Sequence, residues 1–313
     1  MFSFGIDAGT KSWKTCLLNS EKIVELREFE NSIDVLKYLD KVSKNHIDIP
    51  IVLPSGFGIP LKKFERVTKK EFFEMTLKRE GWDVVGLGKF LSSLRKDLNA
   101  YCIPSVKLLP TVPTHRKLNK IDLGTSDKVC SVAHALSNFT EYDKGNFLLI
   151  ELGYAFTAIV VVKRGKIIDG IGGTNMLGGK SRGAIDGELC YLFEFRKEDI
   201  YSGGFLDLEK RFGFGLRAFK EELLKKLLML LKFHNIKKIF TSGRRNNILS
   251  EMDFEFYNLE FAEFGASIGA AMIANGLEGG VYKGLVEHLE IRKAKERVFD
   301  WVLPPLMQTH QER

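Results

Sequence analysis

The feature that most constrains the fold is a strand–turn–strand pattern that opens the chain and returns near its middle. Apolar residues alternate with small ones from Phe2 to Ile6, and an apolar run resumes at Cys16, beyond the turn Asp-Ala-Gly-Thr-Lys-Ser (residues 7–12). Residues 147–162 repeat this order, with an acidic strand end followed by glycine and, later, threonine. A pattern that recurs in this way predicts two halves built on one plan.

The first turn has the residue types of a phosphate-binding loop. Gly9 has no Cβ, so the backbone can turn there and approach a ligand closely. Thr10, Lys11 and Ser12 offer hydroxyl, ammonium and backbone N–H donors, which suit phosphate oxygens. Asp7 is a candidate ligand for Mg²⁺, which usually takes one or two carboxylates and keeps several waters. An ordinary hairpin, with Asp and Gly chosen for the turn, is the alternative from this stretch alone.

Length and composition indicate a soluble globular protein with room for two domains. The 313 residues allow two domains, since a domain has roughly 150 residues. The chain is 44% hydrophobic and 28% charged, an ordinary globular balance. It has no apolar run of about 18 residues and no basic-then-apolar N-terminus, so we expect no membrane partner, no signal peptide and a cytoplasmic location.

Charge and cysteine spacing argue against two further classes of protein. The net charge is +7, but Lys and Arg are mixed with Glu along the chain and form no basic run with interleaved aromatics. We therefore expect an anionic small molecule as ligand and no nucleic acid. The four cysteines, at positions 16, 102, 130 and 190, are widely spaced and contain no CxxC pair. They predict buried free thiols and no zinc site or disulfide framework.

We place the N-terminal domain at residues 1–143, the C-terminal domain at 144–276 and a helical extension at 277–313. The first domain is expected to carry a helical insertion at about 68–101, made of helices Thr68–Arg79 and Leu87–Tyr101. A strand is expected at Val106–Val112, followed by a helix from Ser126 to about Tyr142.

Three polar segments follow predicted strands and are candidates for substrate contact, because open α/β sheets place ligands at strand ends. The first is the loop at residues 54–60. The second is the helix start at Thr125 and Ser126, where backbone N–H groups can bind an anion. The third is the glycine-rich segment 170–183. The candidate residues are Ser55, Gly56, Thr125, Ser126, Gly172, Gly173, Thr174 and Arg182. A plain connector for the first loop and a disordered linker for the third are the alternatives.

Three more elements complete the pattern in the second half. Glu151, Gly153 and Thr157 form a second turn like the first. A strand then ends in Ser242-Gly243-Arg244, where small residues would let a nucleotide lie against the backbone. Residues 263–276 read as a helix with Gly265, Gly269 and Ala270. Glycine in a helix costs about 1 kcal/mol against alanine, so its use predicts close packing against another helix.

Residues 2–276 thus contain, in order, the elements of two phosphate turns, two connecting helices and an adenosine turn. This order resembles that of the superfamily of acetate and sugar kinases, DnaK-type chaperones and actin. The resemblance implies an α/β fold of two ribonuclease-H-like domains, the actin-like ATPase fold, with a nucleotide cleft between them. The whole set of motifs, including Gly-Thr-Ser-Asp-Lys at residues 124–128 and Asp-Gly-Ile-Gly-Gly-Thr at 169–174, is similar to that of the archaeal family described as predicted butyrate kinases. The chain departs from the superfamily pattern at Glu151, Tyr154 and Ser242.

The resemblance implies ATP and Mg²⁺ as cofactors and phosphoryl transfer to a small molecule, a short-chain carboxylic acid in the butyrate kinase case. Asp7 and Glu151 would hold the metal through waters. The residues expected at the nucleotide are Gly9, Thr10, Lys11, Ser12, Gly153, Thr157, Ser242, Gly243 and Arg244.

A carboxylate acceptor needs no general base, whereas an alcohol would need one, for which Asp122 or Asp127 is the candidate. Helix capping is the alternative role of Asp127. Arg182 or Arg244 would neutralise the acceptor or the transferring phosphoryl group. A hydroxyl-directed kinase and a non-catalytic ATP-binding switch remain alternatives, and the oligomeric state is open, a homodimer included.

Overall fold

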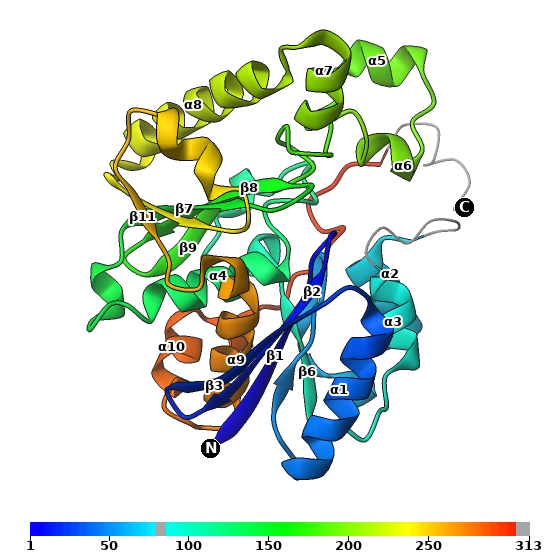
Figure 1. The fold of residues 1–313 in the computed structure, drawn as a ribbon, viewed down its shortest axis with the longest axis vertical. Coiled ribbons are helices and arrows are strands. Elements are labelled where there is room, and N and C mark those ends of the chain that lie inside the picture. Colours follow the sequence, from blue (N-terminus) through cyan, green and yellow to red (C-terminus); the bar gives the residue numbers. More distant parts are fainter. Residues whose placement is uncertain (79–85, 305–313) are drawn as a thin grey trace.

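The computed structural model describes residues 1–78 and 86–304 and contains two mixed sheets with helices between and outside them (Figure 1). The first sheet has the strand order β3-β2-β1-β4-β6-β5. Its strands are β1 (Phe2–Ala8), β2 (Trp13–Asn19), β3 (Lys22–Phe29), β4 (Ile51–Val52), β5 (Gly58–Lys63) and β6 (Ala100–Pro104). The second has the order β11-β10-β7-β8-β9. Its strands are β7 (Phe147–Leu152), β8 (Thr157–Lys163), β9 (Lys166–Ile171), β10 (Lys238–Ser242) and β11 (Phe256–Asn258).

The two sheets follow one plan, as the repeated pattern predicted. In each, the first strand pairs antiparallel with the next strand along the chain, β1 with β2 and β7 with β8. Each first strand also pairs parallel with a strand that returns after a helical crossover, β1 with β4 and β7 with β10. Asp7 and Glu151 are both the last residue but one of the first strand. Equivalent positions in the two sheets therefore carry the two predicted acidic residues.

Two helices, α4 (Ser126–Leu136) and α9 (Gly265–Leu277), lie between the sheets and form the centre of the molecule (Figure 1). All residues of α9 are buried. A Cβ added to Gly269 would lie 1.8 Å from the carbonyl oxygen of Cys130 on α4, and one added to Gly5 would lie 2.1 Å from that of Ser267. The backbones are thus in direct contact at these glycines, which confirms the close helix packing predicted for Gly269.

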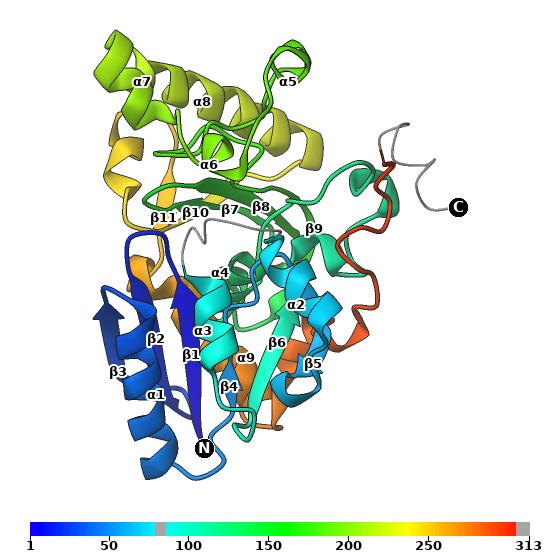
Figure 2. The same ribbon diagram turned by 90° about the vertical axis from the view of Figure 1, so that its right-hand side faces the viewer.

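The remaining helices cover the outer faces. Helix α1 (Ser32–Asn45) and α3 (Leu87–Ser93) lie on the face of the first sheet opposite α9, with α2 (Lys69–Thr76) beside them (Figure 2). Figure 2 shows α8 above the second sheet, with α7 and α5 next to it. These upper helices are α5 (Gly187–Leu192), α6 (Lys197–Ile200), α7 (Phe205–Phe212) and α8 (Gly215–His234). In the parts of the chain described, no helix is long and apolar enough to cross a lipid bilayer.

Several expected element boundaries were wrong. The helix expected up to Tyr101 ends at Ser93, and Ala100–Pro104 is a buried strand between β4 and β5. The strand expected at Val106–Val112 is a single 3₁₀ turn, Val106–Leu108, and α4 ends at Leu136 rather than near Tyr142. Cys190 is exposed, whereas the other three cysteines are buried as predicted. The short apolar runs of this region fit a helix or a strand equally well, and tertiary pairing decides between them.

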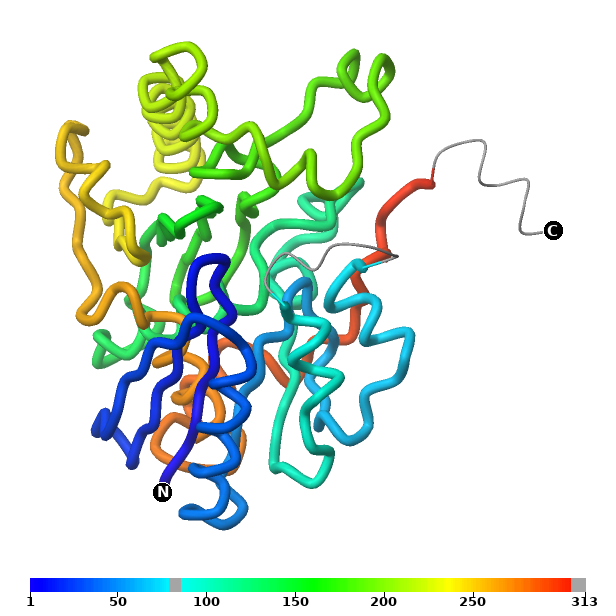
Figure 3. The backbone as a smooth tube through the Cα atoms, turned by 45° about the vertical axis from the view of Figure 1, so that its right-hand side comes forward, coloured from blue at the N-terminus to red at the C-terminus, as the bar shows by residue number. Residues whose placement is uncertain are grey.

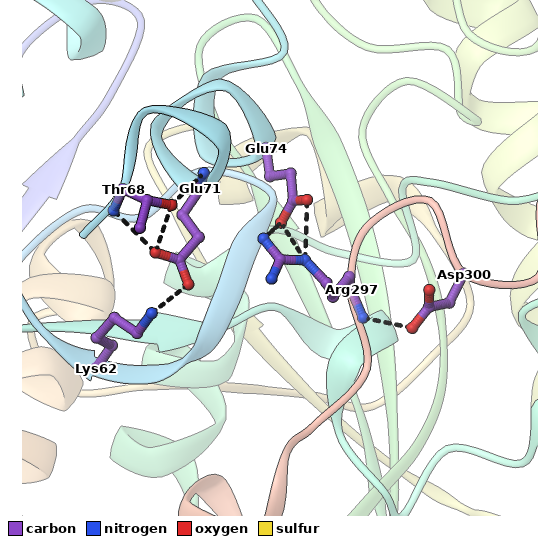
Figure 4. A network of polar contacts seen from close by, with 6 residues as sticks. All are labelled: Lys62, Thr68, Glu71, Glu74, Arg297 and Asp300. Carbon is purple, nitrogen blue, oxygen red and sulfur yellow. Dashed lines mark hydrogen bonds and ion pairs between the residues drawn. The ribbon is translucent and has the colours of Figure 1, made fainter. Parts of the chain in front are cut away.

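The expected helical extension at 277–313 is described up to residue 304, and most of this part is not helical. After α10 (Lys283–His288) and the turn Ile291–Lys293, the chain runs as an irregular segment along one side of the molecule, red in Figure 3. We call residues 294–303 the C-terminal segment. Arg297 forms a bidentate ion pair with Glu74 of α2, with N–O distances from 2.8 to 3.1 Å (Figure 4). The buried Lys107, in the loop that follows β6, donates a hydrogen bond to the carbonyl oxygen of Val298 at 2.6 Å. The C-terminal segment therefore contacts both α2 and this loop.

Candidate nucleotide-binding site

A cavity of about 230 Å³ lies where β1, β7 and β10 end. Three turns that the sequence singled out line it, at residues 8–12, 153–154 and 242–244. Each depends on glycine. A Cβ on Gly9 would lie 2.7 Å from the carbonyl oxygen of Ser12, and one on Gly153 would lie 3.1 Å from that of Phe156. Gly243 has a φ of +98°, which side chains rarely adopt. Backbone N–H groups at such turns suit phosphate oxygens.

An acidic cluster with one lysine lies at the base of the cavity. Lys128 Nζ contacts Asp127 and lies 2.5 Å from Glu151 Oε1. The other oxygen of Glu151 accepts a hydrogen bond from Ser131 at 2.6 Å. Glu151 therefore already has a partner for each oxygen. Among the described residues, the Asp7 carboxylate has no hydrogen-bond or ion-pair partner, so it is the carboxylate of this cluster that is left to take a cation.

The charges of the cluster act on one another. Burial, and then the nearby carboxylates Asp127 and Glu151, raise the pKa of Asp7 to about 7. Burial also acts to raise the pKa of Asp127, but the Lys128 ammonium outweighs it and holds that pKa below its ordinary value. The same carboxylates raise the pKa of Lys128 against the effect of its burial. Lys128 is thus a permanent cation, and Asp7 is a carboxyl group that an added positive charge would favour in its ionised form.

Asp122 links two loops through hydrogen bonds to its carboxylate. Its Oδ1 accepts a hydrogen bond from the N–H of Gly124 at 3.0 Å. Its Oδ2 accepts from the N–H and the hydroxyl of Thr174, at 2.9 and 2.8 Å. A Cβ on Gly172 would collide with the carboxylate at 1.8 Å. Both oxygens of this predicted catalytic residue are therefore used by the chain itself.

Arg244 joins the two halves of the molecule at one side of the cavity. Its guanidinium contacts Glu28 on β3, lies 3.3 Å from Ser12 Oγ in the first turn, and lies 3.3 Å from Glu263. Ser12 also donates a hydrogen bond to Glu28. Ser242, beside Arg244, donates to the carbonyl oxygen of Ala262 at 2.8 Å. The turn at 242–244 is thus in contact with the first phosphate turn.

The cavity brings together most of the predicted site residues. Those that line it are Asp7, Gly9, Thr10, Lys11, Ser12, Gly56, Asp122, Thr125, Ser126, Asp127, Glu151, Gly153, Gly173, Thr174, Ser242, Gly243 and Arg244. They come from both sheets and from the start of α4, although they are far apart in the sequence.

Four predicted residues do not line the cavity. Ser55 is fully buried, and its hydroxyl bonds to the backbone of Leu53. Thr157 is buried in β8. Gly172 lies against Asp122. Arg182 donates to the carbonyl oxygen of Asp199 at 3.1 Å and lies 5.7 Å from the Phe195 ring centroid. Each of these positions contacts other parts of the chain, and the cavity lining does not support their expected ligand contact, which stays a prediction.

The sequence reasoning missed two groups of residues. Lys128 and Ser131 lie on α4 one turn apart, and the charge and hydroxyl pattern of residues 124–131 is the signal that could have pointed to them. The other group consists of apolar and aromatic residues that also line the cavity: Phe57, Met75, Leu87, Phe156 and Tyr201. Apolar residues carry no such signal, because in a sequence they look like core residues. Within the described ranges, no group of three or more His, Cys, Asp or Glu side chains has an arrangement that could hold a metal ion.

Comparison with known proteins shows the fold. The structure is similar to acetate kinase from Entamoeba histolytica, with 13% sequence identity, a TM-score of 0.55, and coverage of 80% of this chain and 86% of that chain. Matches with lower scores include an inorganic polyphosphate/ATP-glucomannokinase from Arthrobacter sp. strain KM, with 12% identity, a TM-score of 0.46 and coverage of 87% and 98%. Another is the activator of the 2-hydroxyisocaproyl-CoA dehydratase from Clostridium difficile with bound ADPNP, with 12% identity, a TM-score of 0.45 and coverage of 92% and 96%.

The fold is therefore the predicted one, the actin-like ATPase fold. No curated protein matches the sequence. A family model matches residues 5–303, nearly the whole chain, so the protein belongs to the family described as "Protein of unknown function (DUF1464)".

Proposed function

We propose that this protein is an ATP-dependent phosphotransferase whose acceptor is a small carboxylic acid, as the resemblance to predicted butyrate kinases implies. The observation that carries the proposal is the meeting of three glycine turns, at residues 8–12, 153–154 and 242–244, around one cavity with an acidic base. Repeated turns of this kind suit the phosphates of a nucleotide, and the third turn suits its nucleoside.

Different residues of the cavity would bind the phosphates, the nucleoside and the metal. Thr10, Lys11 and the backbone at Gly9 and Gly153 would bind the phosphates. Ser242 and Gly243 would lie against the nucleoside. Asp7 would hold Mg²⁺, because it has no partner within residues 1–78 and 86–304 and lies in a buried acidic cluster. Lys128 and Ser131 keep Glu151 fixed close by. The metal, when bound, supplies positive charge that neutralises phosphate oxygens.

The state of the two candidate bases favours a carboxylate acceptor. Both oxygens of Asp122 accept hydrogen bonds from the chain, and Asp127 is paired with Lys128 and Thr125. Each oxygen of these two carboxylates therefore already has at least one partner in the chain, with which a substrate alcohol would have to compete. In the proposed reaction a carboxylate oxygen of the acceptor attacks the γ-phosphorus, the bond from that phosphorus to the bridging oxygen breaks, and ADP leaves. No proton has to move, so the reaction needs no general base.

Hydroxylamine trapping tests this proposal, since acyl phosphates form hydroxamates and phosphate esters do not. The purified protein is incubated with Mg-ATP and a panel of acids, hydroxy acids and sugars, and both ADP and hydroxamate are measured. We expect ADP release with hydroxamate for a carboxylic acid, and we expect Asp122→Asn and Asp127→Asn to retain much of the activity. A general base contributes roughly 100- to 10,000-fold. Turnover without hydroxamate that an Asp variant abolishes would instead indicate a hydroxyl-directed kinase. ATP binding without transfer to any acceptor would indicate a switch protein.

A further inference from the structure

Besides the residues of the three turns, the lining of the cavity contains side chains that are mostly carbon. We call this part of the lining the apolar chamber and define it by Phe57, Met75, Leu87, Phe156 and Tyr201. Phe57 precedes β5, Met75 is in α2, and Leu87 starts α3. Phe156 precedes β8, and Tyr201 follows α6. Both halves of the molecule therefore contribute walls to the chamber.

The walls of the chamber are held in place by backbone contacts. The N–H of Phe57 donates to the carbonyl oxygen of Met75 at 3.0 Å. Gly56 has a φ of +53°, and a Cβ there would lie 2.3 Å from the same oxygen. The Phe156 and Tyr201 rings meet edge to face, with 5.2 Å between centroids. These contacts hold the backbone of Phe57 against that of Met75 and pack the Phe156 ring against the Tyr201 ring.

A lysine joins the two halves at the chamber. Lys197 in α6 donates from Nζ to the carbonyl oxygens of Thr76 and Leu77, at 2.9 and 3.0 Å. These carbonyls end α2, so the contact links the second half of the molecule to a wall contributed by the first. Lys78 also lines this region. Two of the described cations, Lys78 and Lys197, therefore lie in this part of the lining, which suits an anion, while the Asp122 carboxylate lies close enough to Tyr201 to act on its hydroxyl.

Three hydroxyl groups among the described residues of the cavity lining already have partners in the chain. Thr76 donates to the carbonyl oxygen of Phe72 at 3.0 Å, and Thr174 donates to Asp122. Ser126 Oγ accepts from the N–H of Ser55 at 3.1 Å. A sugar would bring several hydroxyls into a space whose polar groups are engaged, and buried hydroxyls without partners cost free energy. An apolar body loses nothing by entering, and it is attracted by the carbon surface.

We infer that the acceptor is a carboxylate with a bulky apolar body, a branched or aromatic acid, and that the chamber takes this body while the carboxylate faces the phosphate turns. The inference rests on the proposed function and names the substrate class of the same cavity. The rings of Phe57, Phe156 and Tyr201 would contact the body on several sides. Burial of one CH₂ group is worth roughly a fourfold gain in affinity, so butyrate and acetate would bind more weakly than larger acids.

Binding measurements test the chamber separately from catalysis. Acetate, butyrate, isovalerate and phenylacetate are titrated calorimetrically into the protein, both alone and saturated with AMPPNP. Phenylacetamide and glucose serve as the uncharged and polyhydroxylated counterparts. We expect affinity to rise along the acid series, with phenylacetate at least tenfold tighter than acetate and phenylacetamide at least tenfold weaker than phenylacetate. Equal affinity along the series, equal binding of phenylacetamide, or tighter binding of glucose would overturn the inference.

Variants locate the binding. Phe57→Ala and Phe156→Ala should each weaken phenylacetate binding about tenfold or more and change acetate binding less than twofold. Phe212→Ala is the matched control, because Phe212 is exposed and does not line the cavity. Phe57→Leu keeps most of the apolar volume and should restore binding if truncation alone disturbs the fold. Unchanged phenylacetate affinity in both alanine variants would contradict the assignment.

The two proposals fail in different ways. If phenylacetate binds and both alanine variants weaken it, but no hydroxamate and no ADP form with Mg-ATP, the chamber assignment stands and the transferase proposal fails. If hydroxamate forms only with acetate or butyrate and larger acids do not bind, the transferase stands and the chamber inference fails.

Discussion

At the scale of single residues, the pairing of Lys128 with Asp127 and Glu151 determines the chemistry of the cavity. It leaves Asp7 as the carboxylate without a partner in the part of the chain described, with a pKa raised to about 7. The sequence predicted Asp7 and Glu151 from their equivalent strand ends. It did not predict that a lysine from α4 would neutralise one of them. That contact joins residues 23 positions apart through tertiary packing, which strand and helix periodicity does not encode.

His134 gives the clearest pH dependence of stability. It is buried in α4, its Nδ1 has no hydrogen-bond partner among the described residues, and burial lowers its pKa from 6.5 to about 4. Between these values the unfolded chain binds a proton that the folded chain does not. This contribution to stability is therefore present above pH 6.5 and is lost as the pH falls towards 4. From pH 7 to pH 5 the expected loss is about 2 kcal/mol.

Urea unfolding of the wild type and of His134→Leu at pH 7 and pH 5 measures this loss. Other groups titrate in the same range, so the comparison is between the two proteins. The wild type should lose about 2 kcal/mol more than the variant over this interval. An equal loss in both proteins would show that His134 is protonated in the folded state.

At the scale of elements, the contact between α4 and α9 is the one that the sequence identified best. The glycines of α9 were predicted to mark close packing, and Gly269 does contact the backbone of Cys130. Strands β5 and β6 were not predicted. The six-residue β5 contains a proline and two lysines, and Ala100–Pro104 follows directly on a helical pattern. The pairing of β6 with β4, and of β5 with β6, depends on the rest of the sheet, which is not encoded in the sequence of either strand.

Gly269→Ala should destabilise the protein. The new methyl group would lie 1.8 Å from a backbone oxygen, so one helix must move. Overpacking of this kind costs about 1–3 kcal/mol, and denaturant unfolding measures it. Gly187→Ala is the control, because its added Cβ has nothing within 4 Å. If Gly269→Ala is as stable as the control, α4 and α9 do not pack as described.

The C-terminal segment should depend on the pair of Arg297 and Glu74. Glu74 is almost fully buried, with 1% of its side chain exposed, whereas 35% of Arg297 is exposed. Arg297→Ala leaves the carboxylate without its partner. Since water reaches one side of the pair, we expect a loss of about 2 kcal/mol, less than the 3–5 kcal/mol typical of a fully buried pair.

A double variant tests the cause of that loss. Glu74→Leu combined with Arg297→Leu should recover much of the stability, because no charge is left buried. Arg217→Ala removes an exposed ion pair with Glu221 and should change stability by less than about 0.5 kcal/mol. If Arg297→Ala matches that control in thermal and urea unfolding, the pair does not hold the segment.

At the scale of the whole molecule, two similar halves meet around one cavity. The fold was predicted from the resemblance to the superfamily, which two phosphate turns, two connecting helices and an adenosine turn carry together. Both halves have the same first hairpin and the same parallel return. The cavity walls were predicted where polar residues follow strands. The apolar chamber was not predicted, since Phe57 and Met75 come into contact only when α2 folds onto the loop before β5.

The central claim is that this cavity binds Mg-ATP through Asp7. The most direct test is thermal unfolding of the wild type, of Asp7→Ala and of the exposed control Asp143→Ala, each with and without millimolar Mg-ATP. A ligand at 100 times its Kd stabilises the folded state by about 2.7 kcal/mol. We predict a rise in Tm of several degrees for the wild type and the control, and none for Asp7→Ala. No rise in the wild type, or the same rise in Asp7→Ala, would contradict the account.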